Sequence, residues 1–150
     1  MKVYLGLGTN LGNKEQNLQK AVNEINKRVG KVTSLSAYYE TAPWGFESDH
    51  SFINAACKAE TTLSPLQVLA VTQEIERELG RTKKSVNGIY SDRLIDIDIL
   101  LYEDQVIKSA ELTIPHPLML ERNFVMKPLL DVAAEVIHPT LKKKLKDLYP

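Results

Sequence analysis

Two aspartates, Asp96 and Asp98, stand inside the most apolar run of the sequence, residues 94–101. Successive side chains of a β-strand point to opposite faces, so both carboxylates are predicted on one face and the intervening isoleucines on the other. With Cα atoms roughly 6.6 Å apart and charges about 5.5 Å apart, the pair would repel by roughly 3 kcal/mol at an effective dielectric constant of about 20. Mg²⁺ would remove this repulsion, because it binds one or two carboxylates together with substrate phosphates. The pattern indicates a magnesium site; the alternative is a solvated strand face.

The segment before these aspartates is cationic. Arginine suits a bidentate grip on phosphate. Transfer of a polyphosphate group depends on positioning and on charge neutralisation, which a metal, arginines and a glycine-containing loop provide. We therefore predict a phosphate-binding role for this segment, the alternative being a solvated basic loop. The candidate phosphate contacts are Arg81, Lys83, Lys84 and Arg93, with His116 and Arg122 further along.

Several aromatic residues are predicted in or beside loops, where they could form stacking walls for a flat heterocycle. Asn54 follows Phe52 by two residues and would share its strand face, so its amide could recognise the polar edge of such a ring. A place in the apolar core is the alternative, especially for Phe52. The aromatic candidates are Trp44, Phe46, Phe52, Tyr90 and Phe124.

The glycine-rich opening at residues 6–12 has the wrong spacing for a dinucleotide-binding fingerprint, and it lacks the Gly-Lys-Ser/Thr of a P-loop. Its glycines favour a tight turn between a strand and a helix. Backbone N–H groups in such a turn could still meet an anion or a ring.

Composition limits the class of protein. The chain has 150 residues, enough for one domain over 1–150, with 19 basic and 19 acidic side chains. A net charge of zero gives no general attraction to nucleic acid or membranes. Cys57 stands alone, so no intramolecular disulfide can form, and a buried inert thiol is expected. Without a signal peptide or an apolar run of 18 residues, we expect a cytoplasmic monomer.

The order of the predicted elements is β-α-β-β-α-β followed by a C-terminal β/α extension, which is the ferredoxin-like α+β pattern. Asn13 is a plausible helix N-cap with Gln16 three residues later, and Ser64-Pro65-Leu66-Gln67 opens a second helix. Predicted strands cover residues 2–8, 31–41, 52–62 and 94–101, and predicted helices cover about 14–29, 64–80 and 120–133. A short strand is expected at 106–107.

Together these segments resemble the 6-hydroxymethyl-7,8-dihydropterin pyrophosphokinases of folate biosynthesis over nearly the whole chain. The resemblance implies a ferredoxin-like fold and transfer of pyrophosphate from ATP to the pterin hydroxymethyl oxygen, with release of AMP. It also implies two Mg²⁺ ions on Asp96 and Asp98, one bridging the α- and β-phosphates and one bridging the β- and γ-phosphates and the attacking hydroxyl. The shared segments are residues 6–12, 41–45 and 52–56, Gln73 and Glu76 with Gly80-Arg81, Arg93 with Asp96 and Asp98, and Pro115-His116 with Arg122 and Phe124.

The same resemblance implies the residues of the site. As catalytic residues it implies Arg81, Arg93, Asp96 and Asp98, of which Asp96 and Asp98 bind metal. On the ATP side it implies Gln73, Glu76, Arg81, Lys83, Arg93, Ile99, His116 and Arg122. On the pterin side it implies Thr41, Pro43, Trp44, Phe52, Asn54, Tyr90, Asp96 and Phe124, with Asn54 at the pterin edge and Phe124 stacking on the ring.

Two departures from the family pattern affect the loop over 81–92. An aromatic-Gly-Pro run is common before the arginine, and here Tyr90 is followed by Ser91 and Asp92. Lys83 stands where a second arginine is frequent, so a bidentate contact becomes a single-point one. We expect the loop to order on binding of both substrates, and Asp92 to place a negative charge near the triphosphate.

Two other functions remain as alternatives. A ferredoxin-like RNA-binding domain would need aromatic residues on adjacent central strands and a basic face, and the sequence has neither. A ferredoxin-like regulatory domain that binds a small molecule would not need two acids in a core strand. A generic Mg²⁺-dependent nucleotidyl or phosphoryl transferase could use the same two aspartates. The products separate the last alternative, since only pyrophosphate transfer releases AMP.

Overall fold

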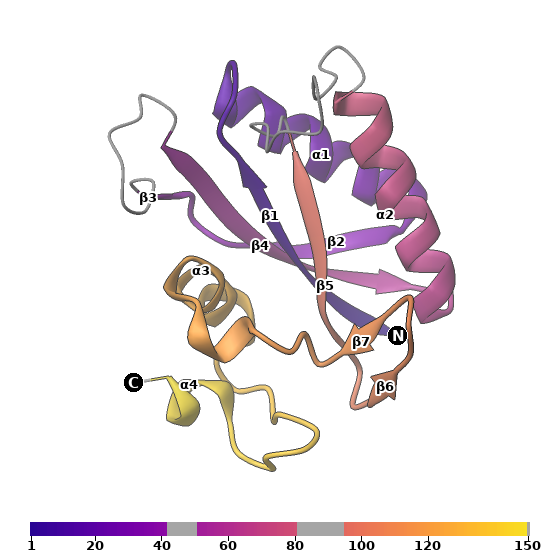
Figure 1. Cartoon of the computed structure of the whole chain (residues 1–150), viewed down its shortest axis with the longest axis vertical. Helices are drawn as coiled ribbons and strands as arrows, with labels where there is room; N and C mark the ends of the chain where they lie inside the picture. The colour runs from indigo at the N-terminus through magenta and orange to yellow at the C-terminus, as the bar shows by residue number, and fades with distance from the viewer. Residues whose placement is uncertain (42–50, 81–94, 150) are drawn as a thin grey trace.

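A single five-stranded antiparallel sheet is the framework of the part of the chain that the computed structural model describes, residues 1–41, 51–80 and 95–149 (Figure 1). Its strand order is β2-β4-β1-β5, and β3 also pairs with β4. The strands are β1 (Lys2–Thr9), β2 (Gly30–Leu35), β3 (Tyr39–Thr41), β4 (Phe52–Thr61) and β5 (Asp96–Tyr102). This order, with α1 following β1 and α2 following β4, confirms the predicted ferredoxin-like arrangement.

The first two helices begin where their capping residues predict. Helix α1 (Lys14–Arg28) follows Asn13, whose side chain accepts a hydrogen bond from the backbone N–H of Gln16 at 3.1 Å. Helix α2 (Pro65–Gly80) has a reciprocal capping box. The Ser64 hydroxyl accepts from the N–H of Gln67 at 3.3 Å, and the Gln67 carboxamide accepts from the N–H of Ser64 at 2.8 Å.

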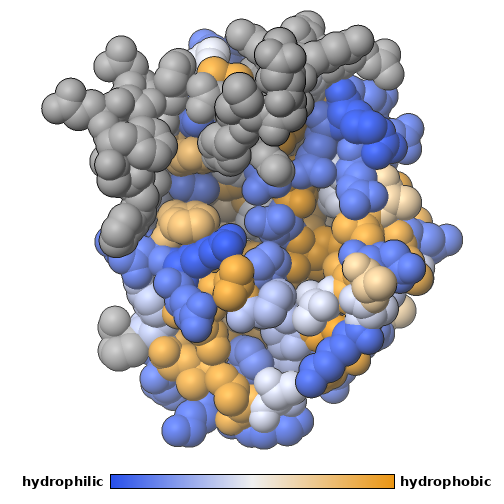
Figure 2. All heavy atoms as spheres, viewed as in Figure 1, coloured by the Kyte–Doolittle hydropathy of each residue, from blue (hydrophilic) through white to orange (hydrophobic). Residues whose placement is uncertain are grey.

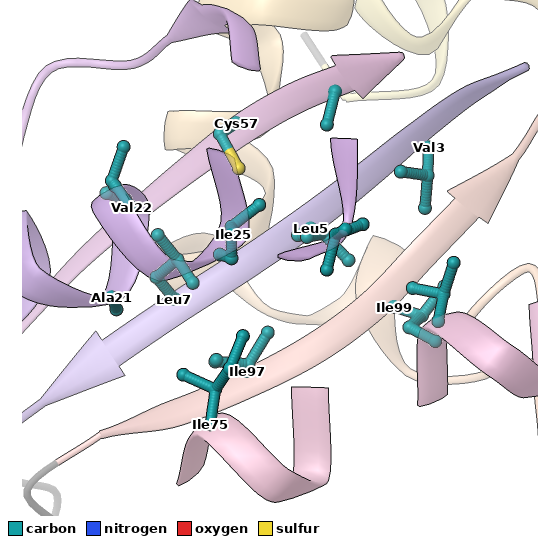
Figure 3. Packing of buried hydrophobic residues seen from close by; sticks show 14 of the residues in the cluster. Val3, Leu5, Leu7, Ala21, Val22, Ile25, Cys57, Ile75, Ile97 and Ile99 are labelled. Carbon is teal, nitrogen blue, oxygen red and sulfur yellow. The ribbon is translucent and has the colours of Figure 1, made fainter. Parts of the chain in front are cut away.

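Both helices cover one face of the sheet and enclose the larger apolar core (Figure 3). Alternate residues of β1 and β5 point into it, among them Leu5, Leu7, Ile97 and Ile99. Cys57 on β4 is fully buried there, and burial raises the pKa of its thiol to about 12. The predicted inert thiol is therefore confirmed.

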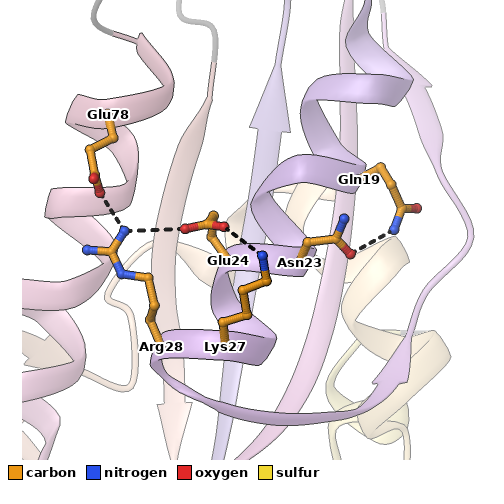
Figure 4. A network of polar contacts seen from close by, with 6 residues as sticks. All are labelled: Gln19, Asn23, Glu24, Lys27, Arg28 and Glu78. Carbon is orange, nitrogen blue, oxygen red and sulfur yellow. Dashed lines mark hydrogen bonds and ion pairs between the residues drawn. The ribbon is translucent and has the colours of Figure 1, made fainter.

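Polar contacts join the exposed surfaces of the two helices (Figure 4). The Arg28 guanidinium near the end of α1 pairs with Glu24 one turn earlier, and across the groove with Glu74 and Glu78 of α2. Glu74 and Glu78 lie on either side of Glu76 in sequence, and their ion pairs with Arg28 connect α2 to α1.

Most of the C-terminal extension covers the lower part of the opposite sheet face (Figure 1), whereas Ile107 and Ile114 pack with the core under α1 and α2. It comprises β6 (Ile107–Lys108), β7 (Thr113–Ile114), the 3-10 helix η1 (Met119–Glu121), α3 (Asn123–Ala133) and α4 (Leu145–Leu148). Met126 and Leu129 of α3 pack with Tyr4, Leu100 and Leu101 of the sheet. The upper part of that face, where β5 begins, is left to polar residues. No described helix is both long and apolar enough to cross a membrane.

Two local predictions were wrong. The strand expected over 31–41 is interrupted, because the buried Ser36 hydroxyl donates to the carbonyl of Ala37 at 2.7 Å and accepts from the N–H of Ala56 at 2.8 Å. The glycines of residues 6–12, in contrast, lie where the strand predicted over 2–8 and the turn after it place them. Gly6 and Gly8 lie inside β1, and only Gly12, with a φ of 64°, lies in the turn. The helix expected over 120–133 is divided into η1 and α3.

Candidate active site

The site is built around the start of β5, where Asp96 and Asp98 alternate with buried isoleucines. Both aspartates are half-buried, on the face away from α1 and α2. The register of β5 with β1 sets Asp96 opposite Gly8 and Asp98 opposite Gly6. These neighbours lack side chains, and the nearest side-chain atoms to the space above them belong to Leu100 beside Gly6 and to Asn54 beside Gly8. Figure 2 shows hydrophilic surface in the middle of this face, above an apolar area over the C-terminal segment.

A third carboxylate, Glu76 of α2, reaches the same strand. It accepts a hydrogen bond from the backbone N–H of Ile97 at 2.8 Å, between the two aspartates in sequence. Burial, followed by the nearby charge and hydrogen bond of Asp96 and the charge of Asp98, raises the pKa of Glu76 to about 7. Glu76 thus lies in the same electrostatic cluster as the two strand carboxylates.

The carboxylates are suited to bind a magnesium ion whose remaining ligands are phosphate oxygens. Among the described residues, no group of three His, Cys, Asp or Glu side chains is arranged to hold a metal by itself. Two half-buried hard oxygen donors on one strand face are, however, the protein share typical of a Mg²⁺–nucleotide site. The raised pKa of Glu76 shows that this cluster carries unfavourable negative charge, which a cation would offset.

His116 lies beside the aspartates, because its backbone N–H donates to the carbonyl of Leu100 on β5 at 3.0 Å. Burial lowers the pKa of the imidazole, Asp98 and Asp96 act in the opposite direction, and Arg122 adds to the lowering. Nδ1 accepts from the N–H of Leu118 at 3.3 Å. The neutral ring therefore carries its proton on Nε2, where it can donate to an anion.

Across β1 from the aspartates, β4 presents Phe52 and Asn54. Asn54 is only 7% exposed and is the register partner of Gly8. Phe124, the second residue of α3, is 39% exposed despite its apolar ring, and the Arg122 guanidinium lies 5.6 Å from the ring centroid. An exposed aromatic ring on α3 and a nearly buried amide on the neighbouring β4 are side chains of the types that line binding sites for flat polar heterocycles.

The remaining predicted residues are distributed as follows. Gln73 is exposed on α2, one turn before Glu76. The side chain of Ile99 is buried in the core beneath the helices, so any contact it makes with a nucleotide is through its backbone. Thr41 ends β3, opposite Phe52. Eight candidate residues lie outside the described part of the chain: Pro43, Trp44, Phe46, Arg81, Lys83, Lys84, Tyr90 and Arg93.

Gly8 is the site position that sequence reasoning missed. It is flanked in the sheet by Asn54 on β4 and by Asp96 on β5, between the two halves of the site. Its signal was present, since a glycine inside an apolar strand pattern often marks a close approach. The sequence pattern places Gly8 at the end of the strand predicted over 2–8, and it suggests ligand contacts only for the backbone N–H groups of the turn between that strand and the helix.

The cluster predicts a pH-dependent stability in metal-free protein. The pKa of Glu76 is about 7 in the folded chain against an ordinary value of 4.5, so the folded state retains a proton that the unfolded state loses. This stabilisation is complete below pH 4.5 and disappears as the pH rises to about 7. After allowance for solvent screening, the loss is about 2 kcal/mol.

Urea unfolding in EDTA between pH 4.5 and 8 measures this effect, with Glu76→Gln as the matched variant. The glutamine can keep the hydrogen bond from Ile97 but cannot titrate. We expect the wild-type free energy of unfolding to fall relative to the variant across this window. Parallel curves for the two proteins would contradict the assignment.

A ferredoxin-like sandwich with clustered carboxylates, a neutral histidine and an exposed aromatic ring defines a candidate metal-dependent phosphoryl-transfer enzyme. Residues 4–134 match the family described as 7,8-dihydro-6-hydroxymethylpterin-pyrophosphokinase. The chain belongs to this family, as predicted, and is therefore an enzyme of the pyrophosphokinase class in folate biosynthesis.

Individual relatives agree with the family match. A 2-amino-4-hydroxy-6-hydroxymethyldihydropteridine pyrophosphokinase of Porphyromonas gingivalis is 51% identical over 138 residues, which cover 91% of this chain and 93% of that protein. The enzyme of the same name from Aquifex aeolicus is 40% identical over 99% of this chain and 90% of its own length.

The fold is also found in a solved structure. The wild-type HPPK-DHPS of Plasmodium falciparum superposes with a TM-score of 0.77 at 19% identity, covering 99% of this chain. The chain spans only 44% of that longer protein. At this identity the likeness supports the ferredoxin-like fold alone.

Proposed function

We propose that the protein transfers pyrophosphate from ATP to the hydroxymethyl oxygen of 6-hydroxymethyl-7,8-dihydropterin, with two Mg²⁺ ions on Asp96 and Asp98. In this reaction the pterin oxygen forms a bond to the β-phosphorus, the bond from that phosphorus to the α–β bridging oxygen breaks, and AMP leaves. The hydroxyl proton is released. Family membership supports the reaction class, and the carboxylate face of β5 supports the metal requirement.

One observation carries the proposal most directly: Gly8 of β1 separates Asn54 on one side from Asp96 on the other. Neighbouring strands lie about 4.8 Å apart. Asn54 and Asp96 are separated by two such spacings, about 10 Å, so a ring whose edge meets the Asn54 amide can lie across Gly8 and extend a one-carbon substituent from its far side to the carboxylates of β5. This spacing suits a heterocycle with a hydroxymethyl arm.

Each described side chain has a role in this proposal. Asn54 recognises the polar edge of the pterin, Phe52 and Phe124 enclose its ring, and the Nε2–H of His116 donates to a phosphate oxygen. When bound, Mg²⁺ supplies neutralisation of the triphosphate charge and a lower pKa for the attacking hydroxyl.

The remaining proposed residues complete the two substrate sites. The nucleotide contacts are Gln73, Glu76, Arg81, Lys83, Arg93, Ile99 and Arg122, and the other pterin contacts are Thr41, Pro43, Trp44 and Tyr90. Arg81 and Arg93 act on the phosphates. We further propose one domain over 1–150, acting as a cytoplasmic monomer without nucleic acid or membrane as a partner; the equal numbers of basic and acidic side chains are in keeping with this.

Product analysis tests the proposal. The purified protein is incubated with ATP, Mg²⁺ and the hydroxymethyldihydropterin, and nucleotides are separated by chromatography. We expect AMP in equal amount to the pterin consumed, no AMP without the pterin, and no turnover in excess EDTA. Formation of ADP instead would indicate transfer of a single phosphoryl group and would refute pyrophosphate transfer.

A further inference from the structure

A contact outside the predicted site joins α3 to β3. The Asp131 carboxylate accepts two hydrogen bonds on Oδ2, from the Tyr39 hydroxyl at 2.8 Å and from the backbone N–H of Ala37 at 3.1 Å. The bond to Asp131 is the main reason that the pKa of Tyr39 is raised, so this hydroxyl remains a donor. Ala37 lies two residues before β3, and Tyr39 is the first residue of that strand.

Strand β3 needs such support because it is short and lies at an edge. It has three residues, and its partner among the described strands is β4 alone. Tyr39 pairs with Asn54, and Thr41 pairs with Phe52. Directly paired residues of an antiparallel sheet point to the same face. The Tyr39 side chain therefore leaves the sheet on the same face as the Asn54 amide and crosses toward α3.

The Asp131 end of this contact lies on α3, the helix that also carries Phe124 on the opposite side of the proposed pterin site. Phe124 and Asp131 are seven residues apart on α3, so they lie on nearly the same side of the helix, about 10 Å apart along its axis. Figure 1 shows α3 against the sheet beside β3 and β4. A bond from Asp131 to Tyr39 thus fixes the separation between the helix that carries Phe124 and the strands that carry Asn54 and Phe52.

Other contacts also hold the two elements that this bond joins. Asp131 is exposed, whereas the preceding segment is already held by the buried Ser36, whose N–H donates to the carbonyl of Ala56 at 2.8 Å. Apolar residues of α3 anchor the helix on the sheet independently. An exposed carboxylate that contributes little to the core but joins the two walls of a pocket is suited to positioning.

We propose that Asp131 is a positioning residue for the pterin half of the site, which it holds at the correct width through Tyr39 and Ala37. The inference rests on the proposed pterin site and extends it to a residue that touches no substrate. Its effect falls mainly on the pterin, because Asp96, Asp98, Glu76 and His116 all lie on the far side of β1 from β3, and of the described nucleotide contacts it is Arg122, beside Phe124, that α3 carries.

The test compares the affinities for the two substrates in Asp131→Ala. Pterin binding is followed by fluorescence titration with 6-hydroxymethyl-7,8-dihydropterin in the presence of Mg²⁺ and a non-hydrolysable ATP analogue, and analogue binding is measured by calorimetry. Loss of a charge-assisted hydrogen bond that orders a pocket wall should raise the pterin Kd by about fivefold and change the nucleotide Kd by less than about twofold. Asp131→Asn keeps an acceptor oxygen and should restore most of the affinity.

Tyr39→Phe removes one of the two bonds and should raise the pterin Kd by about twofold to threefold. In the double variant with Asp131→Ala it should add nothing further, because both changes remove the same bond. Glu103→Ala is the matched control, since Glu103 also accepts from a backbone N–H, that of Lys2 at 2.7 Å, at the opposite end of the sheet. It should leave both affinities unchanged.

Three results would overturn the inference. An unchanged pterin Kd in Asp131→Ala would show that the bond has no role in the pocket. Equal loss of pterin and nucleotide affinity would indicate a general structural role. A wild-type protein that binds no pterin would refute the proposed function as well, whereas normal wild-type binding with either of the first two results would refute the inference alone.

Discussion

Replacement of Asp98 by alanine should lower kcat for AMP formation by at least about 1,000-fold and leave metal-free stability unchanged or about 1 kcal/mol higher. The loss of turnover follows from removal of one of the two hard oxygen donors that hold the proposed Mg²⁺ ions. The stability follows from repulsion within the cluster, because Asp98 is one of the charges that raise the pKa of Glu76. Few substitutions in a half-buried strand would combine these two results.

Asp98 is a sharper choice than Asp96 for this experiment. Asp98 raises the pKa of Glu76 through its charge, whereas Asp96 acts on Glu76 through both its charge and a hydrogen bond, so an Asp96 variant would change Glu76 in two ways at once. Single-turnover AMP formation measures the catalytic effect, and urea unfolding in EDTA at pH 8 measures stability. Asp104→Ala, just beyond the other end of β5, should change neither quantity. A metal-free Asp98→Ala protein that is destabilised by several kcal/mol would show that the carboxylate serves the fold.

Most helices and strands could be predicted from the local sequence, because each has its own capping residues or its own pattern of apolar residues. Ser64 and Gln67 specified the start of α2, and the alternation of Asp96 and Asp98 with isoleucines specified both the strand and its two faces. The break near Ser36 was not accessible. It depends on a bond to Ala56, twenty residues away in sequence, and no local pattern encodes a contact at that separation.

The candidate site was accessible only in part for the same reason. Side chains with strong chemistry, such as Asp98 and His116, can be selected by type. The importance of Gly8 and Asp131 comes from what lies opposite them, Asn54 in one case and Tyr39 in the other. Pairing across strands and between helix and strand arises from the tertiary fold, so residues that act through position emerge only when the register is known.

Gly8→Ala should raise the pterin Kd by about 30-fold or more and change the free energy of unfolding by less than about 1 kcal/mol. A Cβ at this position would lie 2.8 Å from Oδ1 of Asn54, a distance that real Cβ atoms essentially never show, and 3.9 Å from Cδ1 of Phe52. The nearly buried Asn54 amide must therefore move, and it is the group proposed to recognise the pterin edge. The methyl group would also occupy the surface between Asn54 and Asp96 over which the pterin ring has to lie.

The fold should tolerate this change because two effects on stability oppose each other. Alanine is favoured over glycine in a strand interior by roughly 0.5–1 kcal/mol, whereas displacement of a neighbouring side chain costs about 1 kcal/mol. Gly6→Ala is the matched control on the same face of β1. Its Cβ would meet the end of the Leu100 side chain at 3.3 Å, and this flexible group can yield. We expect Gly6→Ala to change the pterin Kd by less than about threefold. Wild-type pterin affinity in Gly8→Ala would mean that the ring does not lie over this strand, and the proposed path from Asn54 to the carboxylates of β5 would have to be abandoned.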